Sequence, residues 1–194
     1  MTEARYDAIV VGAGAMGSAA GWWLARRGRR VLVIDQFEAG HERGSSHGTA
    51  RIFRLGYAVE ALEYATLAME ARLLWRQLEQ ESGTHILDPV GAVDCGSTAV
   101  VESVRLTFEH CGIGYEVLDE RAASGRWKGI RFDGDVLFHR DGAVTRADAA
   151  LRALHDQAIR HGAEIQLGVG RVRVETHAHS VSVAGEDFFA SAPV

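Results

Sequence analysis

Two short apolar runs near the N-terminus are continuous, without the alternation expected of a strand that faces water on one side. The first is Asp7–Val11 and the second is Val31–Ile34, and branched apolar residues dominate both. Runs of this kind are typical of strands buried on both faces of a parallel sheet. The segment between them, Ser18–Ala25, is rich in small and apolar residues and ends near Gly28. The pattern predicts a strand–helix–strand crossover unit.

Three further segments have helical periodicity. Apolar residues recur at steps of four, three and four within 60–82, and Gly83 follows them, which predicts a helix with a buried stripe. Ser97 is a candidate N-cap for a second helix, and Thr145–Asp148 resembles a capping box at the start of a third. The expected buried positions are Leu67, Ala71, Leu74 and Leu78; Val101, Val104, Phe108 and Cys111; and Ala147, Leu151, Leu154 and Ala158.

Shorter pieces between and after these helices have the character of strands. Alternating apolar residues near the C-terminal end predict a strand followed by a hairpin. The chain has only two prolines, so its turns depend on glycine. The strand-like pieces are Ile86–Leu87, Val90–Val93, Tyr115–Leu118, Val136–Phe138, Ala163–Val169, Val172–Val174 and Val181–Val183.

A glycine-rich motif follows the first apolar run directly. Gly12 permits a tight turn, Gly14 lets the backbone approach a pyrophosphate, and Gly17 lets a helix lie close to a strand. Ala15 and Met16 complete the turn, where the first N–H groups of the helix are free to bind phosphate. A Gly-x-Gly-x-x-Gly motif between a strand and a helix is typical of dinucleotide-binding domains, but it does not distinguish FAD from NAD.

An acidic residue, Asp35, ends the second apolar run. Dinucleotide-binding domains place an acid at this distance from the glycine motif, where it binds the ribose hydroxyls. Its carboxylate would repel a 2′-phosphate, so the sequence disfavours NADP. Strand, helix and acid together favour a true dinucleotide site over a coincidental glycine-rich turn.

A polar loop follows, in which Gly44 and Gly48 bracket Ser45, Ser46 and His47. Small residues at both ends let such a loop approach a flat ring, and three hydrogen-bonding side chains can satisfy the polar edge of that ring. The loop context favours a functional role for His47.

Two arginines, Arg51 and Arg54, come after this loop at a spacing of three, which would place them on one face of a helical turn. Two guanidinium groups there could stabilise an anionic reduced flavin and hold a substrate carboxylate in a bidentate fork. The residues alone leave open the alternative of a solvated loop with two surface arginines.

The composition is that of an ordinary globular protein, with 47% hydrophobic and 24% charged residues. The net charge is −5 and no basic block occurs, which argues against a nucleic-acid partner. No apolar run approaches the length of a membrane span, and Met1–Arg5 does not resemble a signal peptide. Cys95 and Cys111 are expected to be free thiols, which favours a cytoplasmic location.

The nine histidines include one pair, His177 and His179, on one face of a predicted strand. No third ligand is evident in the sequence nearby, so no metal site is predicted. His155 and His161 flank the C-terminal half of the third predicted helix, where a charged ring favours the helix dipole. We therefore interpret these two histidines as structural.

The chain resembles the N-terminal half of the monomeric sarcosine oxidase and N-methyltryptophan oxidase family, within the wider D-amino-acid-oxidase-like group of flavoenzymes. The Ser-Ser-His-Gly…Arg-Ile-Phe-Arg segment is specific to this likeness, whereas the glycine motif is not. The matching segments, which extend over nearly the whole chain, are Asp7–Gly17, Val31–Asp35, Gly44–Arg54, Arg126–Ile130 and Leu137–Gly142.

The resemblance implies that FAD and dioxygen oxidise the secondary amine of an N-methylated amino acid such as sarcosine, with release of hydrogen peroxide. It implies that Arg51 sits beside the flavin ring, that Arg54 binds the substrate carboxylate, and that His47 is a third catalytic residue. The residues implied to bind the cofactor are Gly12, Gly14, Ala15, Met16, Gly17, Asp35, Gly44, Ser45, Ser46, His47, Arg51 and Val172.

The chain departs from the family in two ways. Lys128 stands where the family often has proline, in a turn that is not catalytic. The family also continues beyond the position of Val194 with a further strand, a flavin-linking cysteine and an oxygen-activating lysine, and neither Cys95 nor Cys111 matches that cysteine. We therefore expect a fragment that is inactive by itself as an oxidase and whose partner would be the complementary C-terminal half.

These features predict an α/β fold with an FAD-binding, Rossmann-like βαβ parallel sheet, an antiparallel flap and part of an inserted α+β substrate domain. The expected FAD-binding domain is 1–83 with 141–194, and 84–140 begins the substrate domain. One alternative is an inactive FAD-binding remnant, and another is a related flavoenzyme of the glycine oxidase or amino-acid dehydrogenase type. The Ser-Ser-His-Gly loop argues against an NAD-dependent dehydrogenase.

Overall fold

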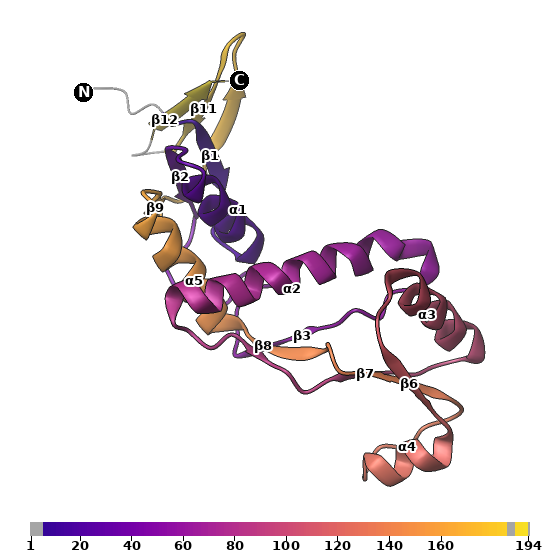
Figure 1. Cartoon of the computed structure of the whole chain (residues 1–194). Helices are drawn as coiled ribbons and strands as arrows, with labels where there is room; N and C mark the ends of the chain where they lie inside the picture. The colour runs from indigo at the N-terminus through magenta and orange to yellow at the C-terminus, as the bar shows by residue number, and fades with distance from the viewer. Residues whose placement is uncertain (1–5, 186–188, 194) are drawn as a thin grey trace. The chain divides into compact units, whose positions relative to one another are not determined.

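The computed structural model describes residues 6–185 and 189–193 (Figure 1). These residues form two compact units. Unit 1 comprises the described residues of Met1–Thr49, Leu78–Thr84 and Ala147–Val194, and unit 2 comprises Ala50–Gln77 and His85–Arg146. The domain division predicted from the sequence, with boundaries at 83/84 and 140/141, assigns residues 50–77 to the FAD-binding domain, whereas here they belong to unit 2. The assignment of these domains to FAD and substrate stays a prediction.

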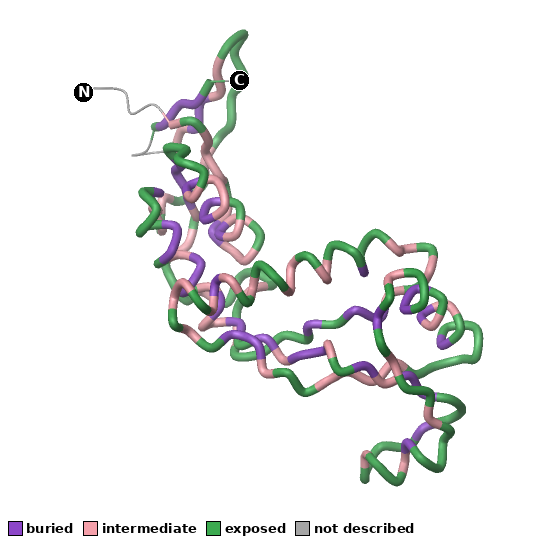
Figure 2. The backbone as a smooth tube through the Cα atoms, in the orientation of Figure 1, coloured by how far each residue is buried: buried purple, intermediate pink, exposed green. Residues whose placement is uncertain are grey.

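A three-stranded parallel sheet lies at the centre of unit 1, in the order β1-β2-β9. β1 is Ala8–Val11, β2 is Val31–Ile34 and β9 is Glu164–Gln166. The middle strand, β2, is buried along its whole length (Figure 2), which explains its run of branched apolar residues. The predicted βαβ unit is confirmed, because β1 and β2 pair in parallel with one helix between them in the chain.

Two helices accompany this sheet. α1 (Ala15–Arg26) contacts β1 and β2, α5 (Ala147–Arg160) contacts β9, and the two helices pack against each other. A Cβ atom at Gly21 would lie 2.5 Å from the Cγ2 atom of Val33, so this glycine allows α1 to lie close to β2.

α5 begins directly after a strand, β8 (Ala143–Arg146), without an intervening loop. Thr145 is therefore a strand residue, and the capping box predicted at Thr145–Asp148 is wrong. The predicted buried face of the helix holds in part, because Leu151 is only half-buried. Its buried positions are Ala147, Leu154 and Ala158, as predicted, together with Ala150, Ala153 and Gln157.

An antiparallel flap follows β9 in unit 1. Its strands, in the order β10-β11-β12, are Arg173–Thr176, Ser180–Ala184 and Phe189–Pro193. Val183 and Ala190 of the flap form one hydrophobic cluster with Leu32 and Ile34 of β2. The predicted flap is confirmed, and β12 is a strand that the sequence pattern missed. The further strand expected after Val194 lies outside the described residues.

Unit 2 contains two antiparallel three-stranded sheets, β3-β8-β4 and β5-β7-β6. The strands not yet given are β3 (Ala50–Phe53), β4 (Leu87–Asp88), β5 (Ala92–Asp94), β6 (Tyr115–Leu118) and β7 (Val136–His139). The helices are a 3₁₀ turn at Val59–Ala61, α2 (Leu62–Ser82, with its last turn in unit 1), α3 (Thr98–Cys111) and α4 (Glu120–Arg126).

The predicted buried faces agree with the structure better for α3 than for α2. α3 buries its predicted positions Val101, Val104 and Phe108, and Cys111 is half-buried. α2 departs from its prediction, because Leu67 is 56% exposed and Leu74 is 37% exposed, whereas Leu78 is fully buried. The stripe is therefore buried at the end of α2 that belongs to unit 1 and is open to solvent further toward its start.

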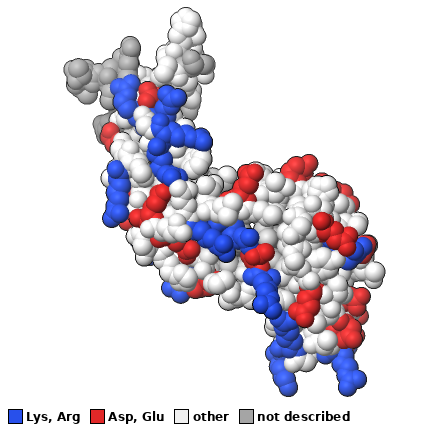
Figure 3. All heavy atoms as spheres, in the orientation of Figure 1, with Lys and Arg blue, Asp and Glu red and all other residues white. Residues whose placement is uncertain are grey.

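No helix in the described part of the chain combines the length and the apolar character needed to cross a membrane. Charged side chains of both signs are interspersed over the face of the molecule in Figure 3. This distribution agrees with the modest net charge of −5.

Candidate functional site

The glycine motif forms the turn that connects β1 to α1. Gly12 has a φ of +105°, in the left-handed region that favours glycine. A Cβ atom at Gly17 would overlap the carbonyl oxygen of Gly12 and lie 3.2 Å from the Cγ1 atom of Val10. The turn and the close helix–strand approach predicted for these two glycines are therefore both present.

Asp35 lies at the carboxyl end of β2, beside this turn. Its Oδ2 atom accepts a hydrogen bond of 2.8 Å from the N–H of Ala13, and its Oδ1 atom accepts one of 3.0 Å from the N–H of Phe37. A carboxylate offers about four lone-pair sites, so acceptor capacity remains for sugar hydroxyls. The carboxylate therefore also fixes the glycine turn, a role that the sequence did not predict.

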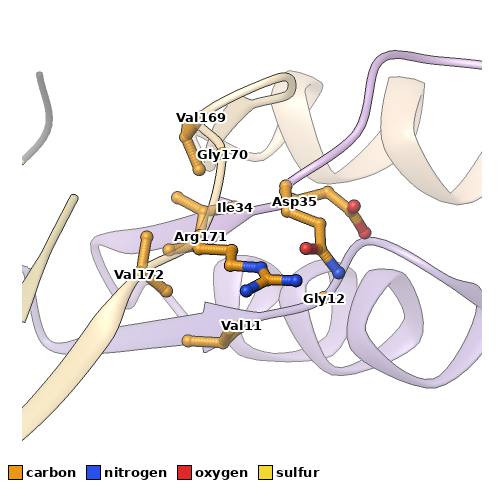
Figure 4. Close-up of a pocket in the computed structure, with 9 residues that line it drawn as sticks. Val11, Gly12, Ile34, Asp35, Val169, Gly170, Arg171 and Val172 are labelled. Carbon is orange, nitrogen blue, oxygen red and sulfur yellow. The ribbon is translucent and has the colours of Figure 1, made fainter. Parts of the chain in front are cut away.

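A cavity of about 380 Å³ opens at the carboxyl ends of β1 and β2 (Figure 4). Its walls combine aliphatic side chains with a few polar groups, which suits a flat ring attached to a sugar. The guanidinium of Arg171 reaches across it toward the side on which Gly12 lies. The lining residues are Val11, Gly12, Ile34, Asp35, Gln36, Val169, Gly170, Arg171 and Val172, of which Gly12, Asp35 and Val172 were predicted.

A second cavity, of about 260 Å³, shares Asp35 and Gln36 with the first. It brings together five further predicted residues, Gly14, Gly44, Ser45, Ser46 and His47. Other parts of its lining come from Ala13, Phe37–His41, Arg43 and, on α5, Asp148, Leu151 and His155. The structure thus joins the polar loop to the glycine turn around two cavities with a common wall.

The contacts of the polar loop explain how it is held there. The hydroxyl oxygen of Ser46 accepts a hydrogen bond of 2.9 Å from the N–H of Ala15, and the Nδ1 atom of His47 makes a short hydrogen bond with the carbonyl oxygen of Gly44. Ala15 thus takes part through its backbone. Met16 is 87% exposed.

The two predicted catalytic arginines belong to unit 2. Arg51 lies in β3 and Arg54 directly follows it, so the predicted helical turn is wrong. Ile52 and Phe53 favour a strand, and residues three apart in a strand point to opposite faces. Arg51 donates a hydrogen bond of 2.7 Å to the carbonyl oxygen of Ala50.

The guanidinium of Arg54 lies over an aromatic ring, with its Cζ atom 5.0 Å from the ring centre of Tyr57. Such a cation–π contact restricts the orientation of the side chain while leaving the edges of the guanidinium open to an anion. The positive charge of Arg54 also acts on Asp94 of β5 in the same unit.

Asp94, which is half-buried, and His139, which is buried, form a pair in unit 2. His139 is fully buried, and its Nε2 atom lies 3.6 Å from Oδ2 of Asp94. Burial lowers the pKa of His139 below its usual value, against the charges of Asp94 and Asp141. Burial likewise raises the pKa of Asp94, against the charges of His139 and Arg54. Both groups are therefore shifted toward their neutral forms.

Sequence reasoning missed several of the residues that surround these cavities. Gln36 and Arg171 are direct neighbours of the predicted Asp35 and Val172, so adjacency alone would have indicated them. His155 carried no such signal, because α5 reaches the glycine turn only in the folded chain. Its Nε2 atom lies 2.8 Å from the hydroxyl oxygen of Ser18 of α1, a contact that the helix-dipole interpretation did not include.

Known proteins match this chain over most of its length. A family model described as "FAD dependent oxidoreductase" (DAO) matches residues 7–192. Monomeric sarcosine oxidase from Bacillus sp. (strain NS-129) is 33% identical over 166 residues, which are 83% of this chain and 43% of that protein. N-methyl-L-tryptophan oxidase from Yersinia pestis (strain Pestoides F) is 28% identical over 186 residues, which are 94% of this chain and 50% of that protein.

Among solved structures, the open form of NikD has a TM-score of 0.81 and 26% identity to this chain. NikD is described as an unusual amino acid oxidase essential for nikkomycin biosynthesis, and the match covers 98% of this chain and 50% of that one. The chain thus spans about half the length, or somewhat less, of the relatives it matches. Since the family model covers nearly all of its residues, the chain belongs to the DAO family of FAD-dependent oxidoreductases.

Proposed function

We propose that unit 1 binds FAD and that the chain is the N-terminal half of an amine-oxidising flavoenzyme. The proposed substrate is an N-methylated amino acid such as sarcosine, whose secondary amine is oxidised with dioxygen to give hydrogen peroxide. The observation that carries the proposal is the meeting of the glycine turn, Asp35 and the Ser45–His47 loop around two cavities with a shared wall. Family membership supports the cofactor, and the sarcosine oxidases among the relatives support the substrate class.

The residues of unit 1 fit the parts of FAD. The aliphatic wall formed by Val11, Ile34 and Val172 suits the adenine ring, and Asp35 would accept hydrogen bonds from the ribose hydroxyls. The glycine turn would leave space for the diphosphate, since within the described residues Ser46 alone comes within 4 Å of a Cβ atom at Gly14, with its hydroxyl oxygen at 3.1 Å. When bound, FAD supplies the ring that accepts two electrons from the amine.

The loop and the arginines have separate proposed tasks. Ser45, Ser46 and His47 would hydrogen-bond the polar edge of the flavin. Arg51 would stabilise negative charge on the reduced ring, and Arg54 would bind the substrate carboxylate through a bidentate fork. The stacking of Arg54 on Tyr57 supports the proposed binding of the carboxylate, because the stacked ring restricts the planar guanidinium to orientations in which its edge can meet a planar anion.

Binding of FAD to the purified chain is the first test. Titration followed by flavin fluorescence and visible absorption should show saturable binding of FAD. FMN, which lacks the adenosine moiety, should bind much more weakly because the Asp35 cavity would stay empty. Absence of FAD binding, or equal binding of FMN and FAD, would contradict the proposal.

A peroxide assay on the FAD-loaded protein then distinguishes the possible chemistries. Turnover of sarcosine or N-methyltryptophan would support the proposed substrate class, whereas turnover of glycine alone would indicate a glycine oxidase type. Because the chain is expected to be inactive by itself, the assay is repeated with the complementary C-terminal half, and FAD binding with no turnover of any amine in that mixture would identify an FAD-binding remnant. If turnover occurs, Arg54→Lys should raise the KM for sarcosine, since lysine cannot form the bidentate fork.

A further inference from the structure

His155 of α5 lies against the glycine turn, where its side chain contacts Ala13 and Ser18. Its Nε2 atom lies 2.8 Å from the hydroxyl oxygen of Ser18 and 3.1 Å from the carbonyl oxygen of Ala13. The hydroxyl of Ser18 in turn donates a hydrogen bond of 2.8 Å to the same carbonyl. Ser18 is fully buried and Ala13 is 5% exposed, so the hydroxyl and the carbonyl find their hydrogen-bond partners in each other and in His155, which is itself half-buried.

The chemistry of these atoms fixes where the protons lie. The carbonyl oxygen of Ala13 can only accept, and the hydroxyl proton of Ser18 is directed to it. The hydroxyl oxygen of Ser18 must then accept from His155, which places a proton on Nε2. A deprotonated Nε2 would instead point a lone pair at the carbonyl oxygen 3.1 Å away, which is repulsive. His155 is therefore a donor at this position.

This donor controls the orientation of one peptide group in the glycine turn. A trans peptide is planar, with its C=O and its N–H on opposite sides. Holding the carbonyl of Ala13 toward Ser18 and His155 therefore turns the N–H of Gly14 away from them. On its other side, Ala13 is held by the hydrogen bond from its own N–H to Asp35. The peptide groups on both sides of Ala13 are thus fixed by side chains from α1, α5 and β2.

We propose that His155 is a positioning residue for the cofactor diphosphate, because with Ser18 it holds the Ala13–Gly14 peptide so that the N–H of Gly14 is presented to phosphate. This inference rests on the proposed binding of FAD. It assigns the phosphate-binding geometry of the turn to a residue more than a hundred positions away in the chain.

The test compares ligands that differ in phosphate. Dissociation constants for FAD, ADP and adenosine are measured by calorimetry for the wild type, His155→Leu and His155→Gln. In His155→Leu, binding of FAD and ADP should weaken roughly tenfold, the loss expected for about one hydrogen bond, while adenosine binding stays unchanged. His155→Gln carries an amide donor of similar reach and should restore most of the affinity for ADP.

Two controls keep the outcome specific. His161→Leu changes a histidine just beyond the same helix, near Glu81 and away from the turn, and should leave all three affinities unchanged. Ser18→Ala removes the middle member of the network without adding bulk to the core, and should reproduce the phosphate-specific loss even if His155→Leu folds poorly.

An unchanged affinity of His155→Leu for ADP would overturn the inference, as would an equal loss for adenosine and ADP or a failure of glutamine to rescue. Failure of the wild type itself to bind FAD is a different result, because it contradicts the proposed function before any variant is compared.

Discussion

The hydroxyl of Ser46 caps the first turn of α1 from a loop 31 residues further along the chain, by accepting a hydrogen bond of 2.9 Å from the N–H of Ala15. The N-cap residue itself is Gly14, which has no side chain for this purpose. The close backbone approach that phosphate requires and the cap that the helix requires are thus supplied by different segments. The polar loop is thereby tied to the glycine turn.

Loss of this remote cap should destabilise unit 1. Ser46→Ala leaves the N–H of Ala15 without its acceptor and is expected to lower the free energy of unfolding by about 1 kcal/mol. Urea unfolding followed by circular dichroism measures the change. Ser97→Ala is the matched control, since Ser97 is the N-cap of α3 but makes no side-chain capping bond within the described structure. Equal destabilisation by both variants would contradict the assignment.

Two helical glycines should respond in opposite directions to alanine. In the middle of a helix, Gly→Ala normally stabilises by about 0.5–1 kcal/mol. Gly17→Ala in α1 should instead destabilise and abolish FAD binding, because the new Cβ would overlap the carbonyl oxygen of Gly12. Gly125→Ala in α4, where nothing in the described structure lies within 4 Å of the new Cβ, should be neutral or mildly stabilising. Thermal unfolding would show whether the two signs differ as expected.

Asp35 should contribute both to cofactor affinity and to stability. Because its carboxylate also accepts the N–H groups of Ala13 and Phe37, Asp35→Ala would disturb the turn as well as the ribose site. Asp35→Asn keeps one acceptor oxygen. It should weaken the free energy of FAD binding by roughly 1.5–3 kcal/mol, the range for hydrogen bonds to a charged group. A fluorescence titration gives this change. Asp7→Asn, at an exposed pair with Arg30, serves as the control and should bind FAD normally.

Stability should fall at mildly acidic pH because of His139. Burial holds its pKa below the unfolded value of about 6.5, so the unfolded chain binds the extra proton first. Its contribution to stability is thus present above pH 6.5 and is lost as pH falls through the lower folded pKa. His139→Phe should remove this part of the pH dependence, measured as melting temperatures between pH 5 and 7.5.

The control for that experiment is Phe108→Leu, which changes the packing against the ring of His139 without removing a titratable group and should therefore lower the melting temperature while leaving the pH dependence in place. Asp94 acts in the opposite sense, since its raised pKa means that its contribution is lost as pH rises from about 3.8. Because the charges of the two groups act on each other, Asp94→Asn is measured over the same pH range to separate the contribution of His139 from that of Asp94. A profile in His139→Phe identical to that of the wild type would contradict the prediction.

The parallel core could be predicted because its signal is local. A continuous run of branched apolar residues predicts a strand buried on both faces, and β2 is buried at each of its positions. The predicted helical turn at Arg51 and Arg54 was wrong because a spacing of three was interpreted without weighing the strand preference of Ile52 and Phe53. A spacing alone does not decide between helix and strand.

The long-range side-chain contacts within each unit could not be predicted from local pattern. Ser46 reaches Ala15, His155 reaches Ser18, and His139 approaches Asp94, and each pair joins segments that the sequence pattern treats as unrelated. Residue type suggested a role for Ser46, because its loop is polar and bracketed by glycines. For His155 and Asp94 only the folded chain identifies the partner.

The order of strands in unit 1 has a consequence for the newly made chain on the ribosome. β2 can pair with β1 early, but its other edge is completed by β9, where Val33 pairs with Ile165. All of unit 2 must be synthesised before that partner exists. During this interval an apolar strand would present an unpaired edge, which is a template for association with other chains. The nascent protein is therefore open to association through this edge until β9 emerges.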